Sequence, residues 1–159
     1  MFRTGIGYDV HRLAKGKPLI LGGLEITSDL GSVGHSDGDV LSHSIVDALL
    51  GAAGLGDIGT YYPSDNDQWK DFSSLKFIAE SVKRINNSGY KISNIDATII
   101  LQYPYLNDYI LDIRKKLAIE MNIHLSEIAI KATTTDGLGF IGASEGIGAL
   151  AIATLIFKK

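Results

Sequence analysis

The segment GIGALAIATLIF, residues 146–157, is the feature that most limits the fold of this chain, because it carries no charged side chain. A run of this length suits either a buried helix or a strand. Its alternation of glycine, alanine and branched residues favours a strand that is buried on both faces. The chain is therefore expected to contain a sheet that surrounds this strand.

The remaining apolar periodicity predicts alternating strands and helices. Strands are expected at 2–12, 18–26, 91–102 and 127–135, and helices at 39–53, 73–87 and 106–121. The glycine pair within 18–26 suggests a bend or bulge, and Ser73 is expected to cap the second helix. The fold class predicted is α+β, that is, mixed α/β, with a single sheet of mixed strands and helices packed on one face.

Composition restricts the classes of function. The chain has 159 residues, 45% of them hydrophobic, and no stretch resembles a linker, so we expect one domain over residues 1–159. The net charge is −3 and the basic residues are scattered, which argues against binding nucleic acid. No window approaches the roughly 20 apolar residues of a membrane span, and no signal sequence is recognised. We therefore expect no membrane partner and a cytoplasmic location.

Two motifs predict a metal site. The chain has no cysteine, so His, Asp and Glu are the candidate ligands. In GYDVHR, Asp9 and His11 point to one face if the segment is a strand, and His43 lies on the first helix. These three form a set that leaves a fourth position open on zinc, as in catalytic sites. The alternative is that each histidine is a hydrogen-bonded core residue. Because three such groups occur together, this is the weaker interpretation.

Other polar residues near these motifs leave alternatives open. Asp39 and Asp47 share a helix face with His43, and each either orients His43 or is merely solvated. The loop GHSDGD, with His35 and Ser36, is either an anion site or a simple turn with a helix cap. In KATTTDGLGF, the threonines and Asp136 suit phosphate oxygens and Mg²⁺, whereas a strand threonine ladder is the alternative.

The motifs GYDVHR, GHSDGDVLSHSIVDALLGAAGLGDIG and KATTTDGLGFIGASEGI occur here in order, and with them the chain resembles the 2-C-methyl-D-erythritol 2,4-cyclodiphosphate synthase family of the non-mevalonate isoprenoid pathway. The resemblance covers essentially the whole chain. It implies a lyase that cyclises 4-diphosphocytidyl-2-C-methyl-D-erythritol 2-phosphate and releases CMP. It also implies a homotrimer with active sites between subunits, where one subunit provides the zinc ligands and the next provides the cytidine pocket.

The resemblance also assigns roles to residues. It implies zinc on Asp9, His11 and His43, a second divalent metal (Mg²⁺ or Mn²⁺) on Asp136, and His35 and Thr134 as catalytic residues. The residues implied to bind the cytidine diphosphate substrate are Asp9, His11, His35, Ser36, Asp57, Ile58, Gly59, Tyr62, Pro63, Asp65, Asn66, Leu101, Pro104, Tyr105, Leu106, Ala132, Thr133, Thr134, Thr135, Asp136 and Phe140.

Four positions differ from the family pattern. Tyr105 stands where a lysine is usual, Asn66 where an acid is usual, Asp136 where a glutamate is usual and Ala143 where an arginine is common. Two other functions remain compatible with the same residues. One is a zinc-dependent phosphohydrolase that admits water to the metals, and the other is a metal-stabilised trimeric binding protein without turnover.

Overall fold

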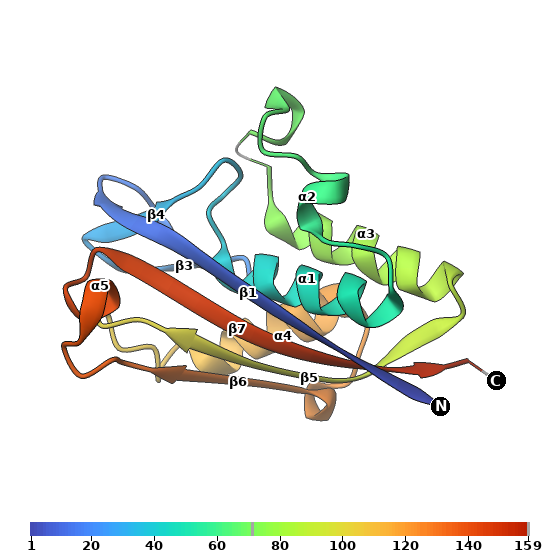
Figure 1. Ribbon diagram of the computed structural model, residues 1–159. Helices are drawn as coiled ribbons and strands as arrows, with labels where there is room; N and C mark the ends of the chain where they lie inside the picture. Colours follow the sequence, from blue (N-terminus) through green and yellow to red (C-terminus); the bar gives the residue numbers. More distant parts are fainter. Residues whose placement is uncertain (71, 159) are drawn as a thin grey trace.

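The computed structural model describes residues 1–70 and 72–158, and its main feature is a five-stranded sheet (Figure 1). The strands in spatial order are β4 (Leu30–Val33), β1 (Phe2–Lys15), β7 (Gly146–Phe157), β5 (Tyr90–Ile100) and β6 (Ile128–Thr133). The pair β5–β6 is parallel and the other neighbouring pairs are antiparallel. The predicted mixed α/β class with a mixed sheet is confirmed.

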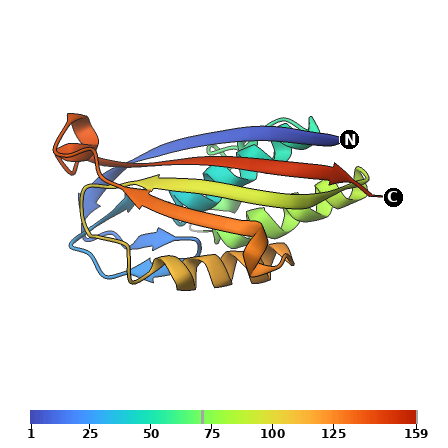
Figure 2. The same ribbon diagram turned by 90° about the horizontal axis from the view of Figure 1, so that it is seen from below.

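Three helices cover one face of this sheet (Figures 1 and 2). They are α1 (Val40–Ala53), α3 (Ser74–Asn87) and α4 (Ile110–Met121). Shorter elements are α2 (Ile58–Tyr61), α5 (Gly139–Gly142) and the 3₁₀ turns η1 (Asp67–Trp69) and η2 (Leu125–Glu127). No helix in the described part of the chain is long and apolar enough to cross a membrane.

The segment 18–26 corrects the prediction of a single sheet. It forms a separate two-stranded hairpin of β2 (Leu19–Leu21) and β3 (Leu24–Ile26). The glycine pair is the turn of this hairpin and not a bulge, because Gly22 and Gly23 have φ angles of 58° and 71°. A two-residue turn with positive φ at both positions matches the twist of antiparallel strands, and glycine adopts it without strain.

Strand β7 lies at the centre of the sheet, between β1 and β5, so the strand interpretation of the uncharged segment is confirmed. Its inward residues, such as Ala149 and Ala151, are fully buried under α1. The expected burial on both faces is wrong for a single chain. Leu150 and Ile152 point to the opposite face of the sheet and are 37% and 41% exposed.

The carboxylate of Asp39 caps α1 and also binds the β2–β3 turn. Asp39 caps α1 by accepting from the Ser42 amide at 3.0 Å. Its fully buried carboxylate also accepts from the amides of Gly22 and Gly23 in the β2–β3 turn, at 3.0 and 2.8 Å. Ser73 occupies the predicted N-cap position of α3, but its side chain makes no capping hydrogen bond. Helix α4 begins at Ile110, four residues later than predicted, after a turn at Leu106.

A close approach of α1 to β1 sets the position of the helix on the sheet. A Cβ atom at Gly7 would lie 1.9 Å from the backbone oxygen of Ser44, and one at Gly5 would lie 2.2 Å from that of Ala48. Side chains at these positions would force the two backbones apart. The glycines therefore allow α1 to lie directly on β1, next to Asp9 and His11.

We predict that Gly7→Ala lowers the free energy of unfolding by about 3 kcal/mol, because overpacking here displaces a backbone and not a flexible side chain. The matched control is Gly51→Ala on the exposed side of α1, where an added Cβ meets nothing within 4 Å. This control should raise stability by about 0.5–1 kcal/mol, since alanine favours helix. Urea denaturation of both variants measures the difference, and equal stabilities would contradict the role of the close approach.

Candidate metal site and substrate pockets

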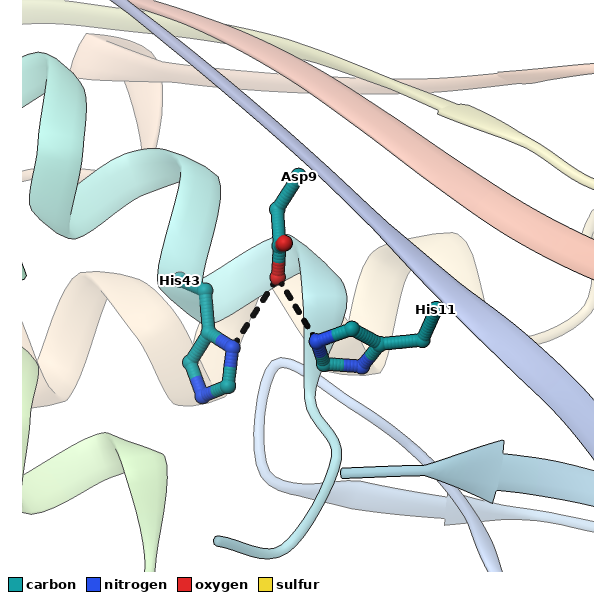
Figure 3. Close-up of side chains that lie close together, drawn as sticks. All are labelled: Asp9, His11 and His43. Atoms are coloured by element: carbon teal, nitrogen blue, oxygen red, sulfur yellow. Dashed lines mark hydrogen bonds and ion pairs between the residues drawn. The ribbon is translucent and has the colours of Figure 1, made fainter. Parts of the chain in front are cut away.

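Three side chains that bind metals in other proteins meet between β1 and α1 (Figure 3). Asp9 and His11 point from β1 to the face that carries the helices, and His43 points toward them from α1. His11 Nε2 and His43 Nδ1 each lie 3.0 Å from Asp9 Oδ2. One ligand atom from each residue lies within 4.8 Å of the other two. The predicted three-residue set is thus brought together, across 34 positions in the chain.

The cluster favours an ionised carboxylate at Asp9. Burial by itself raises the pKa of Asp9, but the hydrogen bonds and charges of His11 and His43 outweigh burial and hold this pKa well below its usual range. Burial lowers the pKa of His11, but its hydrogen bond and charge interaction with Asp9 outweigh burial and raise this pKa. A carboxylate between two imidazoles is a donor set that zinc takes in proteins.

The hydrogen-bond partner of the second ring nitrogen of His11 indicates whether the cluster fits a metal ion. His11 Nδ1 lies 3.0 Å from the backbone oxygen of Gly38. A carbonyl oxygen only accepts, so Nδ1 carries a proton, and Nε2, which faces Asp9, is the nitrogen on which a metal ion would replace a proton. Metal-binding histidines commonly donate their second N–H to a carbonyl in this way. The donor set and the contact of His11 with Gly38 therefore fit a zinc ion.

The two aspartates on the face of His43 have other partners. Asp39 binds the β2–β3 turn, as described above. Asp47 Oδ1 accepts from the backbone amide of Ile58 at 2.7 Å and so holds the start of α2. Burial raises the pKa of both carboxyl groups. The hydrogen-bond partners of the His43 ring are instead Asp9, Ser36 and Ser74.

A pocket of about 230 Å³, which we call the metal-side pocket, opens beside the cluster. The predicted site residues that line it are His11, His35, Ser36, His43, Ile58, Gly59 and Tyr62. Part of its lining is aromatic, because Tyr62 stacks on Phe77 with ring centroids 4.2 Å apart and meets Trp69 edge to face. A polar cluster next to an apolar wall is typical of small-molecule pockets.

The other residues predicted for this side lie in the segment 57–66 around α2. Asp57 caps α2 by accepting from the Thr60 amide at 2.8 Å, and its hydrogen bonds with Thr60 lower the pKa of this exposed carboxylate. His35 Nε2 donates to the backbone oxygen of Asn66 at 3.0 Å. Pro63 and the exposed Asp65 lie between these contacts in the chain. Substrate binding by these residues stays a prediction.

A smaller pocket of about 120 Å³, which we call the threonine-side pocket, collects the predicted cytidine-binding residues. Those that line it are Leu101, Pro104, Tyr105, Leu106, Ala132, Thr133 and Thr134. Two hydrogen bonds join the segments that build it. The Leu101 amide donates to Thr133 O at 3.0 Å, and the Gly137 amide donates to Gln102 Oε1 at 3.2 Å.

The loop after β6 carries further predicted residues. Thr134 Oγ1 lies 3.3 Å from Asp136 Oδ1 and accepts from the Asp136 amide at 3.2 Å. Thr135 Oγ1 donates to the backbone oxygen of Leu138 at 2.7 Å. Phe140, in α5, lines neither of these two pockets but a third surface pocket, beside Glu145. Within residues 1–70 and 72–158, Asp136 joins no group of three metal-binding side chains.

The metal-side pocket and the threonine-side pocket share no lining residue within one chain. The first is built by β1, α1 and the α2 region, and the second by the ends of β5 and β6 and the loop between β5 and α4. A single chain therefore does not bring all of the predicted site residues into one pocket.

The residues that the sequence analysis missed are Ser74 and Asp37. Ser74 Oγ lies 2.9 Å from His43 Nε2, and Asp37 binds the hydroxyl and the amide of Ser74. Asp37 lies within the motif GHSDGD, but its spacing from the other candidate ligands does not indicate a role. Ser74 is an ordinary residue for the start of a helix. Because 31 positions separate His43 from Ser74, no local pattern predicts their contact.

The fold and the site together define a mixed α/β protein with a three-ligand metal cluster that opens on a pocket, which is the arrangement of metal-dependent enzymes. The model of the YgbB family matches residues 2–156. The chain belongs to this family, whose similar curated members carry the name 2-C-methyl-D-erythritol 2,4-cyclodiphosphate synthase.

Three relatives illustrate the similarity. The synthase of Clostridium acetobutylicum is 53% identical over 97% of this chain and 99% of its own length. The bifunctional IspDF from Campylobacter jejuni has a TM-score of 0.96 at 39% identity over 99% of this chain, which spans only 42% of that protein. IspF from Plasmodium falciparum, solved as a CDP complex, has a TM-score of 0.87 at 36% identity, with 99% and 97% of the two chains covered.

We predict that His11→Ala and His43→Ala each abolish stoichiometric zinc binding while the far-ultraviolet circular dichroism stays unchanged, because the cluster lies beside a pocket and outside the apolar core. Metal analysis after dialysis against zinc checks this. His124→Ala is the matched control, since His124 is an exposed histidine in the η2 cap. Unfolding of both site variants would instead indicate a structural metal.

Proposed function

We propose that this chain converts 4-diphosphocytidyl-2-C-methyl-D-erythritol 2-phosphate to 2-C-methyl-D-erythritol 2,4-cyclodiphosphate and releases CMP, as the names of its relatives indicate. The observation that carries the proposal is the Asp9–His11–His43 cluster at the edge of a pocket, in a chain that is 53% identical to a named synthase. The reaction is an intramolecular phosphoryl transfer and belongs to isoprenoid precursor biosynthesis.

The chemistry needs positioning and positive charge more than it needs a strong base. The attacking phosphate is already anionic and is tethered to the diphosphate that it attacks, so the reaction depends on holding the two groups in line. No lysine or arginine lines the metal-side or the threonine-side pocket as the structure describes them, so their side chains do not supply the positive charge that several phosphates need. We propose that Asp9, His11 and His43 hold zinc and that Asp136 contributes to a Mg²⁺ or Mn²⁺ site with the substrate's own oxygens. When bound, these ions supply Lewis-acid charge neutralisation at the phosphate oxygens.

The chain's own polar groups then orient the substrate. His35 and Ser36 line the metal-side pocket next to the cluster. The Ser36 hydroxyl donates there to a phosphate oxygen, and the His35 ring does so when its Nε2–H turns from the backbone oxygen of Asn66 to the substrate. Thr134 Oγ1 lies at the threonine-side pocket, where its hydroxyl turns from Asp136 to a phosphate oxygen. These two residues, His35 and Thr134, are our candidates for stabilising charge that develops during transfer.

A homotrimer joins the two pockets in this proposal. The sheet face that carries no helix presents two pairs of large apolar residues, Ile6 opposite Ile152 and Tyr8 opposite Leu150. Their exposed fractions run from 37% to 66%, and adjacent apolar side chains of this size usually mark an interface. Packing of this face around a threefold axis brings the metal-side pocket of one subunit to the threonine-side pocket of the next. We place the trimer in the cytoplasm.

The threonine-side pocket is our proposed cytidine site. The relative from Plasmodium falciparum is described as a CDP complex, which supports a cytidine nucleotide ligand for this chain too. Tyr105, in place of the usual lysine, forms part of the lining and contacts Tyr103, with ring centroids 4.9 Å apart. An aromatic pair here offers stacking surface to a pyrimidine ring.

The direct test is phosphorus NMR of the products formed from authentic substrate. We expect a cyclic diphosphate and one equivalent of CMP. Linear phosphates would favour a zinc-dependent phosphohydrolase. Tight CDP binding without release of CMP would favour a binding protein without turnover, and either result would overturn the proposed reaction.

We predict that Thr134→Val lowers kcat about 10- to 100-fold and changes KM less than threefold, if the hydroxyl acts mainly in the transition state. Steady-state kinetics of CMP release measures this. Thr27→Val is the control, because Thr27 is an exposed threonine outside both pockets. Wild-type kcat in Thr134→Val would remove this residue from the catalytic set.

We predict that Ile152→Lys dissociates the assembly, because it places a charge at the centre of the open sheet face. Analytical ultracentrifugation should show a trimer for the wild type and a monomer for the variant, with a matching loss of turnover. Ile119→Lys is the control, since Ile119 is 79% exposed on α4, away from this face. A monomeric wild type with full activity would exclude a site between subunits.

A further inference from the structure

The ring of His43 has hydrogen-bond partners on both nitrogens. Nδ1 lies 3.0 Å from Asp9 Oδ2, and Nε2 lies 3.0 Å from Ser36 Oγ and 2.9 Å from Ser74 Oγ. A serine hydroxyl both donates and accepts, so contact with a hydroxyl alone does not determine which nitrogen carries the proton. His43 Nε2 therefore differs from His11 Nδ1, whose proton follows directly from a carbonyl partner.

The hydroxyl of Ser74 is not free to point either way. Ser74 Oγ donates to Asp37 Oδ1, and the Ser74 backbone amide donates to Asp37 Oδ2 at 2.8 Å. A carboxylate only accepts, so the hydroxyl hydrogen of Ser74 is directed to Asp37. The lone pairs of Ser74 Oγ remain for His43, and Nε2 must then donate to them. Ser74 is fully buried, so solvent does not compete for this contact.

Asp37 is itself held from two sides. Its backbone amide donates to Phe72 O at 3.2 Å, just before α3, and its Oδ1 accepts from the Asp39 amide at 3.2 Å, just before α1. The same carboxylate takes the Ser74 amide at the start of α3, where the Ser73 side chain makes no cap. One side chain therefore caps α3, joins α3 to the loop before α1, and sets the direction of the Ser74 hydroxyl.

We propose that Asp37 and Ser74 are positioning residues for the metal site, which hold the Nε2–H of His43 and so present Nδ1 toward Asp9 and His11 as the nitrogen that a metal ion would take. The inference rests on the proposed role of this cluster in holding zinc. Ser36 has a different part, because it lines the metal-side pocket and its hydroxyl is available to a bound ligand. The hydrogen bonds from Asp37 through Ser74 to His43 thus hold one imidazole, as the backbone oxygen of Gly38 holds the imidazole of His11. Both arrangements match the outer partners that orient metal-binding histidines.

The first experiment measures zinc affinity of the full-length, metal-free protein by competition with a chromophoric chelator. Ser74→Ala should raise the zinc dissociation constant about 10- to 100-fold, which is the usual effect of removing an outer partner of a metal ligand. Ser81→Ala is the matched control. Ser81 is also a fully buried serine of α3, but its hydroxyl has no hydrogen-bond partner, so zinc affinity should stay within about twofold of the wild type.

The second experiment observes the proton on His43 Nε2, through the ¹⁵N chemical shifts of the ring in metal-free protein. The wild type should show a protonated Nε2, and Ser74→Ala should show Nε2 protonated in only part of the molecules. Asp37→Asn gives a stronger test, because an amide N–H facing Ser74 Oγ turns the serine hydroxyl toward His43. This variant should leave Nε2 without a proton and raise the zinc dissociation constant at least tenfold.

The outcomes separate this inference from the proposed function. A wild type that binds no zinc would overturn the proposed metal and leave the NMR test of the His43 Nε2 proton intact. Wild-type zinc affinity and ring shifts in both Ser74→Ala and Asp37→Asn would overturn the positioning role alone. Thermal unfolding of each metal-free variant checks the fold, and if Ser74→Ala fails to fold, Asp37→Asn, which keeps the volume of the side chain, decides between the two.

Discussion

The direct contact between the backbones of β1 and α1 is the constraint on which the site depends. Gly5 and Gly7 leave no side chain between the strand and the helix, so the carbonyl oxygens of α1 lie where Cβ atoms would otherwise be. This brings His43 to within hydrogen-bond distance of Asp9. Side chains at positions 5 and 7 would hold α1 farther from β1 and so move the imidazole away from Asp9.

Helix α1 also organises the segments around the pocket, through three carboxylates in or just before it. Asp37 binds the start of α3, Asp39 binds the turn between β2 and β3, and Asp47 binds the start of α2. Each carboxylate accepts backbone amides that have no partner within their own element, and bonds to a charged acceptor are stronger than those to a neutral one. Polar contacts between α1 and the neighbouring segments therefore build the pocket. The apolar core lies between this helix and the sheet.

The two faces of the sheet have different roles. One face is covered by α1, α3 and α4 and holds Asp9 and His11, while the other shows the apolar pairs of β1 and β7. The alternation of side chains along β1 places the metal ligands and the apolar residues Ile6 and Tyr8 on opposite faces of a single strand. The same strand thus contributes to the candidate metal site on one face and, in our proposal, to subunit assembly on the other.

The sequence by itself determined the local elements and the ligand set, and the tertiary structure decided how they are connected. Periodicity identified α1, α3 and the central strand β7, and i, i+2 spacing predicted that Asp9 and His11 share a face. Such patterns are readable because they depend on neighbours in the chain. Sequence analysis missed the hairpin at Gly22 and Gly23 and the links from Asp37 to Ser74 and from Asp47 to Ile58. These features depend on backbone amides and side chains that only packing brings together, and 37 positions separate Asp37 from Ser74.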